Sequence, residues 1–124
     1  MMTVKDIFAL GAALISEEPG EDPDTEKFTP HYMNILLAET FDVENGIRRS
    51  LGEDELAEIP MVKKLTDEVP YHAKLTRIAL PYGLAANYFR ESGDNYHEVS
   101  FRGEYANAVN AADVYDSGMI KSCY

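Results

Sequence analysis

Apolar residues recur at three- and four-residue spacing in four segments of the chain, and this periodicity constrains the fold more than any other feature. The first segment runs from Thr3 to about Ser16, and Asp6 follows Thr3 at the spacing of a capping box. No stretch between turn signals shows the strict alternation of apolar and polar residues that a half-buried strand needs. The sequence therefore predicts an all-α fold, a compact bundle of about four helices.

An acidic loop at 17–24, interrupted by two prolines and a glycine, separates the first helix from the second. The second helix starts either near Asp24 or at Thr29-Pro30, because proline suits the first helical position. It ends at Gly52, which is a natural stop signal. A glycine costs about 1 kcal/mol relative to alanine inside a helix, so a break near 42–46 is the alternative to one long helix.

The last two helices are predicted to form an antiparallel hairpin. The third runs from about Tyr71 to Arg90 with Pro81 inside it. A kink is expected there, because proline removes one backbone hydrogen bond and crowds the carbonyl group of Arg77. The fourth helix begins after Asp94, whose carboxylate can cap it, and should end near residues 117–118.

Two further segments lack a helical period. Residues 53–70 are bounded by prolines and are predicted to form an extended, partly packed connection. Residues 118–124 are expected to be a flexible tail. The chain of 124 residues is long enough for one core and too short for two, so residues 1–124 are taken as a single helical domain.

The charge balance limits the choice of partners. The chain has 22 acidic and 11 basic side chains and a formal net charge of −11, which argues against broad binding to DNA or to anionic membranes. Cys123 is the single cysteine, so no internal disulfide can form. The longest apolar stretches are too short to span a bilayer, and the cytoplasm is the expected compartment.

The residues with reactive side chains do not form an enzyme motif. None of the three histidines, His31, His72 and His97, has another His or Cys three or four residues away, the spacing of a metal-binding pair on one helix face. The acidic pairs Glu55/Glu58 and Glu91/Asp94 have the spacing found in magnesium-dependent nucleotide pyrophosphohydrolases, but a proline adjoins the first pair and a glycine interrupts the second. We therefore expect no catalytic residue, no metal and no cofactor, and we keep a metal-dependent pyrophosphohydrolase as a weaker alternative.

Apolar residues in the segments without a helical period are candidates for partner contacts, because no helix face hides them. They are Ile59, Met61 and Val62 in the connection and Met119, Ile120 and Tyr124 in the tail. The alternative is that they fold back on the bundle.

The order of the segments, and two short motifs in particular, resemble a known family. The motifs are Leu65-Thr66-Asp67-Glu68-Val69-Pro70-Tyr71 and Leu80-Pro81-Tyr82-Gly83-Leu84-Ala85-Ala86. They resemble the head-to-tail connector (adaptor or head completion) proteins of tailed bacteriophages and prophages.

The resemblance implies an all-α subunit that assembles as a homo-oligomeric ring beneath the portal and performs no chemistry. Its expected partners are the portal and the tail or other connector proteins, DNA would only pass through the lumen, and no membrane is involved. Such a subunit would occupy the host cytoplasm during assembly and then the virion neck. An acidic regulatory module that binds a basic protein site is the alternative function.

Overall fold

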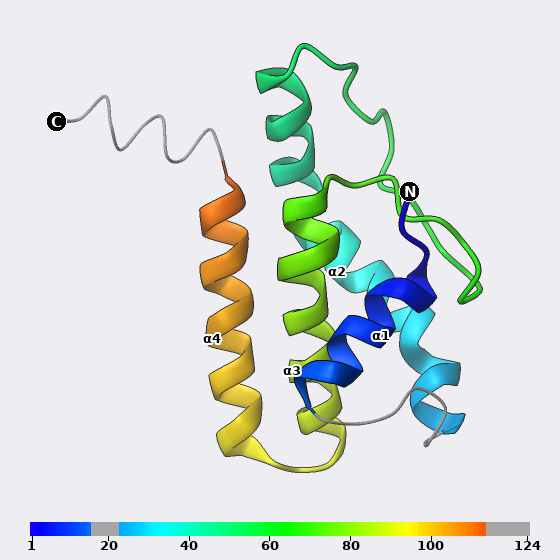
Figure 1. Ribbon diagram of the computed structural model, residues 1–124, viewed down its shortest axis with the longest axis vertical. Coiled ribbons are helices and arrows are strands. Elements are labelled where there is room, and N and C mark those ends of the chain that lie inside the picture. The colour runs from blue at the N-terminus through cyan, green and yellow to red at the C-terminus, as the bar shows by residue number, and fades with distance from the viewer. Residues whose placement is uncertain (16–22, 114–124) are drawn as a thin grey trace, which may run out of the picture.

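The computed structural model describes residues 1–15 and 23–113, without the side chains of 23–26. In chain order the elements are α1 (Val4–Leu14), α2 (Pro23–Ser50), the π-helical turn η1 (Lys74–Ala79), α3 (Leu80–Glu91) and α4 (Asn95–Ala112), as Figure 1 shows. Within the described residues, β pairing is limited to one isolated bridge between Thr3 and Glu68. The prediction of an all-α bundle of about four helices is confirmed.

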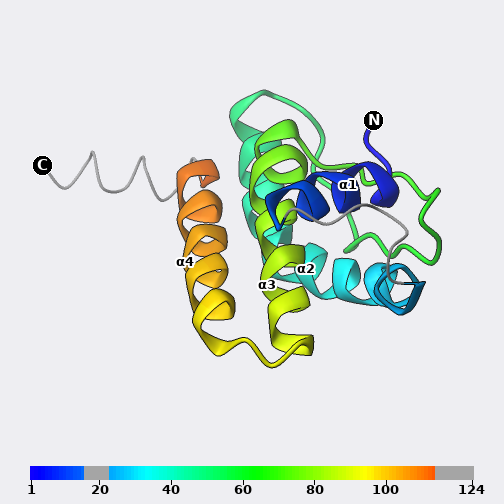
Figure 2. The same ribbon diagram turned by 60° about the horizontal axis from the view of Figure 1, so that its bottom comes forward.

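Helix α3 lies at the centre of the bundle. It packs against α1, α2 and α4, and the two views in Figures 1 and 2 both place it between α1 and α4. The turn after α3 reverses the chain, so that α3 and α4 form the expected antiparallel hairpin. The core fills the space among the helices and includes side chains from every element. Its largest fully buried apolar side chains are Val4, Ile7, Met33, Leu36, Leu37, Val69, Leu75 and Leu80.

Two buried tyrosines have hydroxyl groups that find hydrogen-bond acceptors on α2. The Tyr71 hydroxyl donates to the carbonyl oxygen of Leu37 at 2.7 Å, and the Tyr105 hydroxyl donates to Glu39 at 2.9 Å. Burial raises the pKa of both phenols above the ordinary value, with the neighbouring carboxylates Glu44 and Glu39 acting in the same direction. Both tyrosines therefore stay neutral hydrogen-bond donors that tie α2 to the segments packed on it.

Local capping signals set several helix ends, as predicted. The Thr3 hydroxyl accepts from the Asp6 N–H at 3.2 Å while the Asp6 carboxylate accepts from the Thr3 N–H at 3.0 Å, which completes the capping box of α1. Asp94 accepts from the His97 N–H at 3.1 Å and caps α4. Gly52, directly after α2, has a φ of 72°, a value that suits glycine.

Acidification should destabilise the fold partly through three carboxylates that accept hydrogen bonds from the backbone. Hydrogen bonds from backbone N–H groups lower the pKa of Asp6, Asp67 and Asp94 below 3.8. Because the folded-state pKa lies below the unfolded one, their contribution is fully present above the unfolded pKa and is lost as the pH falls through the folded-state value. Thermal unfolding followed between pH 2 and pH 6 should therefore show a smaller acid-induced loss for Asp67→Asn than for the wild type. Equal losses would contradict the assignment for Asp67.

Helix α2 is one continuous helix of 28 residues, so the start near Asp24 is correct and the start at Thr29-Pro30 is wrong. The break considered near 42–46 does not occur. Asn45 and Ile47 are buried on either side of the glycine, and their packing outweighs its helix cost of about 1 kcal/mol.

The third helix differs from the prediction at its start, because η1 begins at Lys74. The chain then continues without a break into α3, with Pro81 in the first turn. The Leu80 N–H donates to the carbonyl of Leu75, five residues earlier, so the turn before the proline is widened. Such π turns are a known cause of helix kinks and relieve the crowding that the proline ring creates. The proline was expected to kink the helix, and the structure places the departure from regular α-helix in η1, the turn that precedes Pro81.

Helix α4 ends at Ala112, because Asp113 takes extended backbone angles. This is earlier than the predicted end near residues 117–118. The expected tail at 118–124 and most of the acidic loop lie outside the described residues.

Candidate protein-interaction surface

Two asparagines on α2 hold the extended segment 53–70 against the bundle. The Asn34 carboxamide donates to the Val62 carbonyl and accepts from the Val62 N–H, both at 2.8 Å. Asn45 does the same with Leu56, at 3.2 Å and 2.8 Å. Each carboxamide thus makes the pair of bonds that a neighbouring strand would make. The two asparagines lie about three turns apart on one face of α2, so they fix the segment at two points.

A buried carboxylate anchors the end of the same segment. Glu44 is fully buried, and its two oxygens accept from the His72 backbone N–H at 2.7 Å, from His72 Nδ1 at 2.8 Å and from Arg48 Nε at 2.6 Å. Arg48 also donates to the carbonyl of Pro70 at 2.7 Å, and His72 Nε2 lies 3.0 Å from Glu53. Both oxygens of Glu44 are occupied by protein donors, so this cluster fixes the backbone of the segment.

Residues 1–15 and 23–113 contain no group of three or more His, Cys, Asp or Glu side chains that could hold a metal ion. The acidic pairs considered from the sequence have other roles. Glu55 forms an exposed ion pair with Arg49 at 2.6 Å. Glu91 accepts from the Tyr32 hydroxyl, and Asp94 caps α4.

The anchored segment presents part of the predicted contact surface. Met61 is 75% exposed and Ile59 is 49% exposed, whereas Val62 is only 3% exposed and packs in the core. Successive side chains of an extended chain point to opposite sides, so the Asn34 clamp that turns Val62 inward turns Met61 outward. Val62 is therefore removed from the predicted surface, and the fold-back alternative holds for this residue. Met119, Ile120 and Tyr124 lie outside the described residues.

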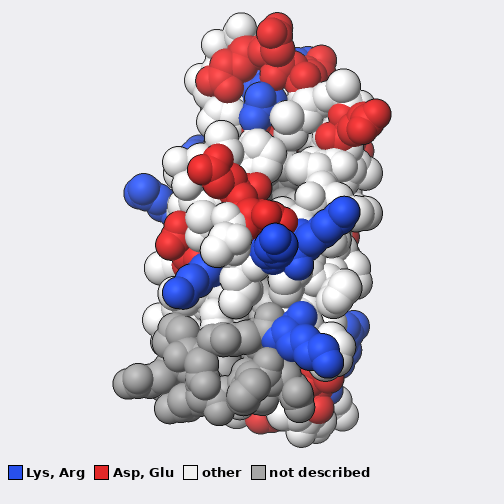
Figure 3. Space-filling model, turned by 90° about the vertical axis from the view of Figure 1, so that its right-hand side faces the viewer, with Lys and Arg blue, Asp and Glu red and all other residues white. Residues whose placement is uncertain are grey.

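The charged side chains on this side of the molecule are unevenly distributed. Figure 3 shows most side chains at the top of the face to be acidic, and acidic and basic side chains lying side by side over its middle and lower parts. This face is thus mixed in sign, in spite of the acidic balance of the whole chain.

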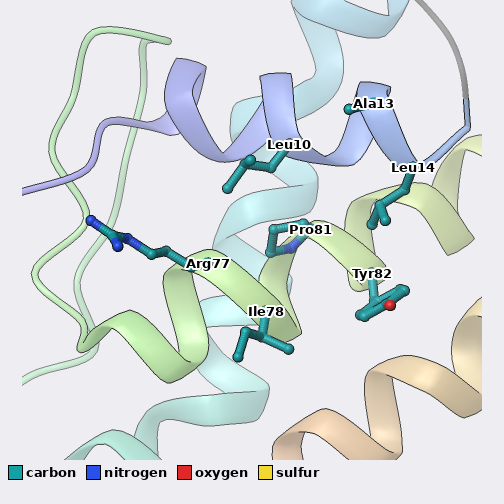
Figure 4. Close-up of a pocket in the computed structure, with 7 residues that line it drawn as sticks. All are labelled: Leu10, Ala13, Leu14, Arg77, Ile78, Pro81 and Tyr82. Atoms are coloured by element: carbon teal, nitrogen blue, oxygen red, sulfur yellow. The ribbon is translucent and has the colours of Figure 1, made fainter.

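An open apolar groove of about 360 Å³ lies where α1, η1 and α3 meet. Its lining consists of Leu10, Ala13, Leu14, Arg77, Ile78, Pro81 and Tyr82. Figure 4 shows Leu10 and Leu14 extending from α1 toward the helix that carries Ile78, Pro81 and Tyr82. Ile78 is 50% exposed although its spacing placed it on the buried face of the third helix. Sequence reasoning missed this groove.

A signal for the groove is present in the first helix. Between Ile7 and Ile15 every residue is apolar or glycine, so the helix has a wider apolar surface than one buried face requires. Leu10 and Leu14 are one turn apart on the side that the core leaves open.

A third exposed apolar surface lies on α4. Tyr96 and Val99 are one turn apart and are the most exposed large apolar side chains of this helix. Gly103 and Ala106 continue the same face without a charge. This face, the groove, and Ile59 with Met61 belong to different elements of the fold.

Comparison with known proteins adds no relative. The sequence matches no family model, and searches of curated proteins and of solved structures find no similar chain. None of the helices in the described part of the chain combines the length and the apolar character that crossing a bilayer requires.

Proposed function

We propose that the chain is a head-to-tail connector subunit of a tailed bacteriophage or prophage, which assembles as a ring beneath the portal. The observation that carries this proposal is the presence of exposed apolar side chains on separate elements, at Ile59 and Met61 in the anchored segment and at Tyr96 and Val99 on α4. A subunit of a closed ring needs two unlike surfaces that meet each other in neighbouring copies. A further surface is then available to a portal or tail protein.

The positions of the two family-like motifs support this reading. In the first motif, the carbonyl groups of Leu65 and Asp67 accept from the N–H groups of Lys5 and Val4, both at 2.9 Å, so the motif fixes the start of α1. The second motif, 80–86, forms the central part of the bundle in α3. Both motifs build the scaffold that positions the exposed segment.

The acidic composition fits a subunit that surrounds passing DNA. A lumen lined with carboxylates repels phosphates and allows DNA to slide without binding. The net charge of −11 also disfavours association of free subunits, so the ring is expected to form on its partner.

Introducing charge at the anchored segment should abolish binding to the portal. The test is copurification of the chain with a portal protein from the same genome, followed by electron microscopy for rings. The double substitution Ile59→Asp with Met61→Asp should reduce recovery of the complex by at least about tenfold, because charges in the buried centre of an interface cost more than about 1.4 kcal/mol. Both side chains are exposed in the free chain, so circular dichroism should stay unchanged.

Ile35→Asp provides the matched control, since Ile35 is a similarly exposed apolar residue on α2, outside these surfaces. It should leave binding intact. If the double variant still binds the portal, the contact assignment is wrong. If the wild type binds no portal or tail protein but retains a basic protein, the regulatory-module alternative replaces the connector.

A further inference from the structure

We propose that copies of this chain associate head to tail, with the exposed face of α4 in one copy docked into the apolar groove between α1, η1 and α3 of the next. Tyr96 and Val99 enter the groove, and Glu104 pairs with Arg77 of the neighbouring copy. The inference rests on the proposed function, because it names the two surfaces that would close the ring, but it is tested on the isolated chain.

The groove is left uncovered by the described part of the chain. Leu10 and Leu14 are each 39% exposed and Ile78 is 50% exposed. Figure 4 shows Arg77 and Tyr82 at opposite ends of the lining. Arg77 is exposed and forms no ion pair with any described residue. A suitable occupant therefore offers apolar side chains for the groove and one carboxylate for its cationic end.

The outward face of α4 has these properties. Tyr96 is 80% exposed and Val99 is 71% exposed. Among the exposed positions of α4 from Tyr96 to Ala111, all of them described, Glu104 is the only carboxylate. Glu104 forms no ion pair within residues 1–15 and 23–113. The face thus carries an apolar pair and a single unpaired negative charge, and the groove carries an apolar lining and a single unpaired positive charge.

A chain cannot place this face in its own groove. Helix α4 packs on α3 and η1, and Tyr105 is buried on that side. Tyr96 is nine residues from Tyr105, about two and a half helical turns, so it lies on the opposite side of α4. Figures 1 and 2 both place α4 at one edge of the bundle, with α3 between it and α1. The contact therefore joins two copies through unlike surfaces, and such a contact closes into a ring where the rotation between copies permits.

The spacing of the groups agrees on the two surfaces. Val99 and Glu104 are five residues apart on α4, and Arg77 and Tyr82 are five residues apart on the continuous helix of η1 and α3. At about 1.5 Å per residue, each pair spans about 7.5 Å. When the two helices run antiparallel with Val99 beside Tyr82, Glu104 reaches Arg77. Tyr96 and Val99 then act as the anchors of a helix laid into a groove.

The charges favour this face over the other exposed apolar residues. Ile59 and Met61 are followed by the exposed Lys63 and Lys64, which would bring two cations to Arg77. Two chains that each carry a charge of −11 repel each other in most orientations. Contact through α4 brings one carboxylate to the groove, and that carboxylate meets a cation.

The association of free chains should be weak. Helix α4 has 18 residues, so it is about 27 Å long and about 10 Å wide. Its face is therefore smaller than the roughly 800 Å² per partner of a typical stable interface. A covalent trap is needed to detect the contact.

Cysteine crosslinking of the full-length chain provides this trap. In a Cys123→Ser background, one chain carries Ile78→Cys and a second, larger tagged chain carries Val99→Cys. Both positions are exposed, so circular dichroism should stay unchanged. A short bismaleimide should crosslink the mixture to the heterodimer and give no homodimer with either chain alone. A chain with both substitutions should give a ladder of dimers, trimers and larger species.

Ile35→Cys provides the matched control, because Ile35 is a similarly exposed residue on α2 that belongs to neither surface. In place of Ile78→Cys, it should give no crosslink with the Val99→Cys chain.

A charge exchange between the two chains tests the ion pair. Arg77→Glu in the chain with Ile78→Cys should lower the heterodimer yield roughly two- to fivefold, the effect expected for one exposed ion pair. Glu104→Arg in the chain with Val99→Cys should restore it. Lys74→Glu makes the same change in net charge at an exposed position of η1 that does not line the groove, and it should leave the yield unchanged.

Three outcomes would overturn the proposal. Homodimers of the Val99→Cys chain would show that two α4 faces meet each other instead. Absence of the heterodimer would remove α4 from the groove, and failure of the charge exchange to restore the yield would remove the ion pair. Portal binding is measured separately. A chain that binds the portal without forming the ladder keeps the connector function and loses this inference, whereas a ladder without portal binding does the reverse.

Discussion

Replacing Arg48 with methionine should lower the free energy of unfolding by about 3–5 kcal/mol, because it takes the arginine away from a buried carboxylate and leaves His72 as the only donor to it among the described residues. Glu44 is fully buried and Arg48 Nε lies 2.6 Å from it. Methionine keeps much of the apolar stem of the side chain, so the loss reports mainly on charge and hydrogen bonding. The same change removes the bonds from Arg48 to the carbonyl groups of Asp54 and Pro70, which releases the segment between them.

Urea unfolding at neutral pH, followed by circular dichroism, measures this loss. Arg49→Met is the matched control, since Arg49 is the next residue and its ion pair with Glu55 is half exposed. It should cost no more than about 1 kcal/mol. Adding Glu44→Gln to Arg48→Met should recover part of the stability, because the unpaired charge is then absent. A loss below about 1 kcal/mol for Arg48→Met would show that Glu44 does not need its ion pair.

Gly83→Ala should destabilise the chain by about 1–3 kcal/mol through overpacking at the crossing of three helices. A Cβ atom at this position would lie 2.8 Å and 2.9 Å from the two methyl groups of Leu36 and 3.2 Å from Tyr105 Cδ1. Leu36 is 1% exposed and Tyr105 is 7% exposed, so neither side chain has open space to move into. The absent side chain of Gly83 thus allows α2 and α4 to approach α3.

Thermal unfolding of two further variants separates overpacking from helix propensity. Gly103→Ala on α4 meets no atom within 4 Å, so it should stabilise the chain by about 0.5–1 kcal/mol. Combining Gly83→Ala with Leu36→Ala should cost less than the sum of the two single changes, because the shortened leucine makes room for the new methyl group. If the loss of stability in the double variant equals the sum of the two single losses, the contact between the new methyl group and Leu36 is not the source of the destabilisation.

Local features of the sequence were sufficient to predict the helices and most of their ends. The capping box of Thr3 and Asp6, the cap at Asp94 and the glycine after α2 act through backbone groups within four residues along the chain. These signals do not depend on how the helices pack. The end of α4 was predicted too late, because the segment after Asp113 offers no strong stop signal before Gly118.

The course of segment 53–70 could not be predicted in the same way. Asn34 and Asn45 have no local feature that separates them from ordinary polar residues on a helix surface. Their partners, Val62 and Leu56, are 28 and 11 residues away. The difference between an exposed Met61 and a buried Val62 follows from this pairing, and an apolar pattern alone assigns both residues to the same surface.

The amino-acid sequence by itself determined the helical class of this protein, its charge and the caps that begin its helices, because these depend on composition and on neighbours along the chain. Only the tertiary structure decided that Glu44 would be buried against Arg48 and His72, and that Ile78 would face a groove when its spacing placed it in the core. The physical reason is that hydrophobic periodicity shows which residues can be buried. Which of them are buried depends on the helix or segment that packs against each face.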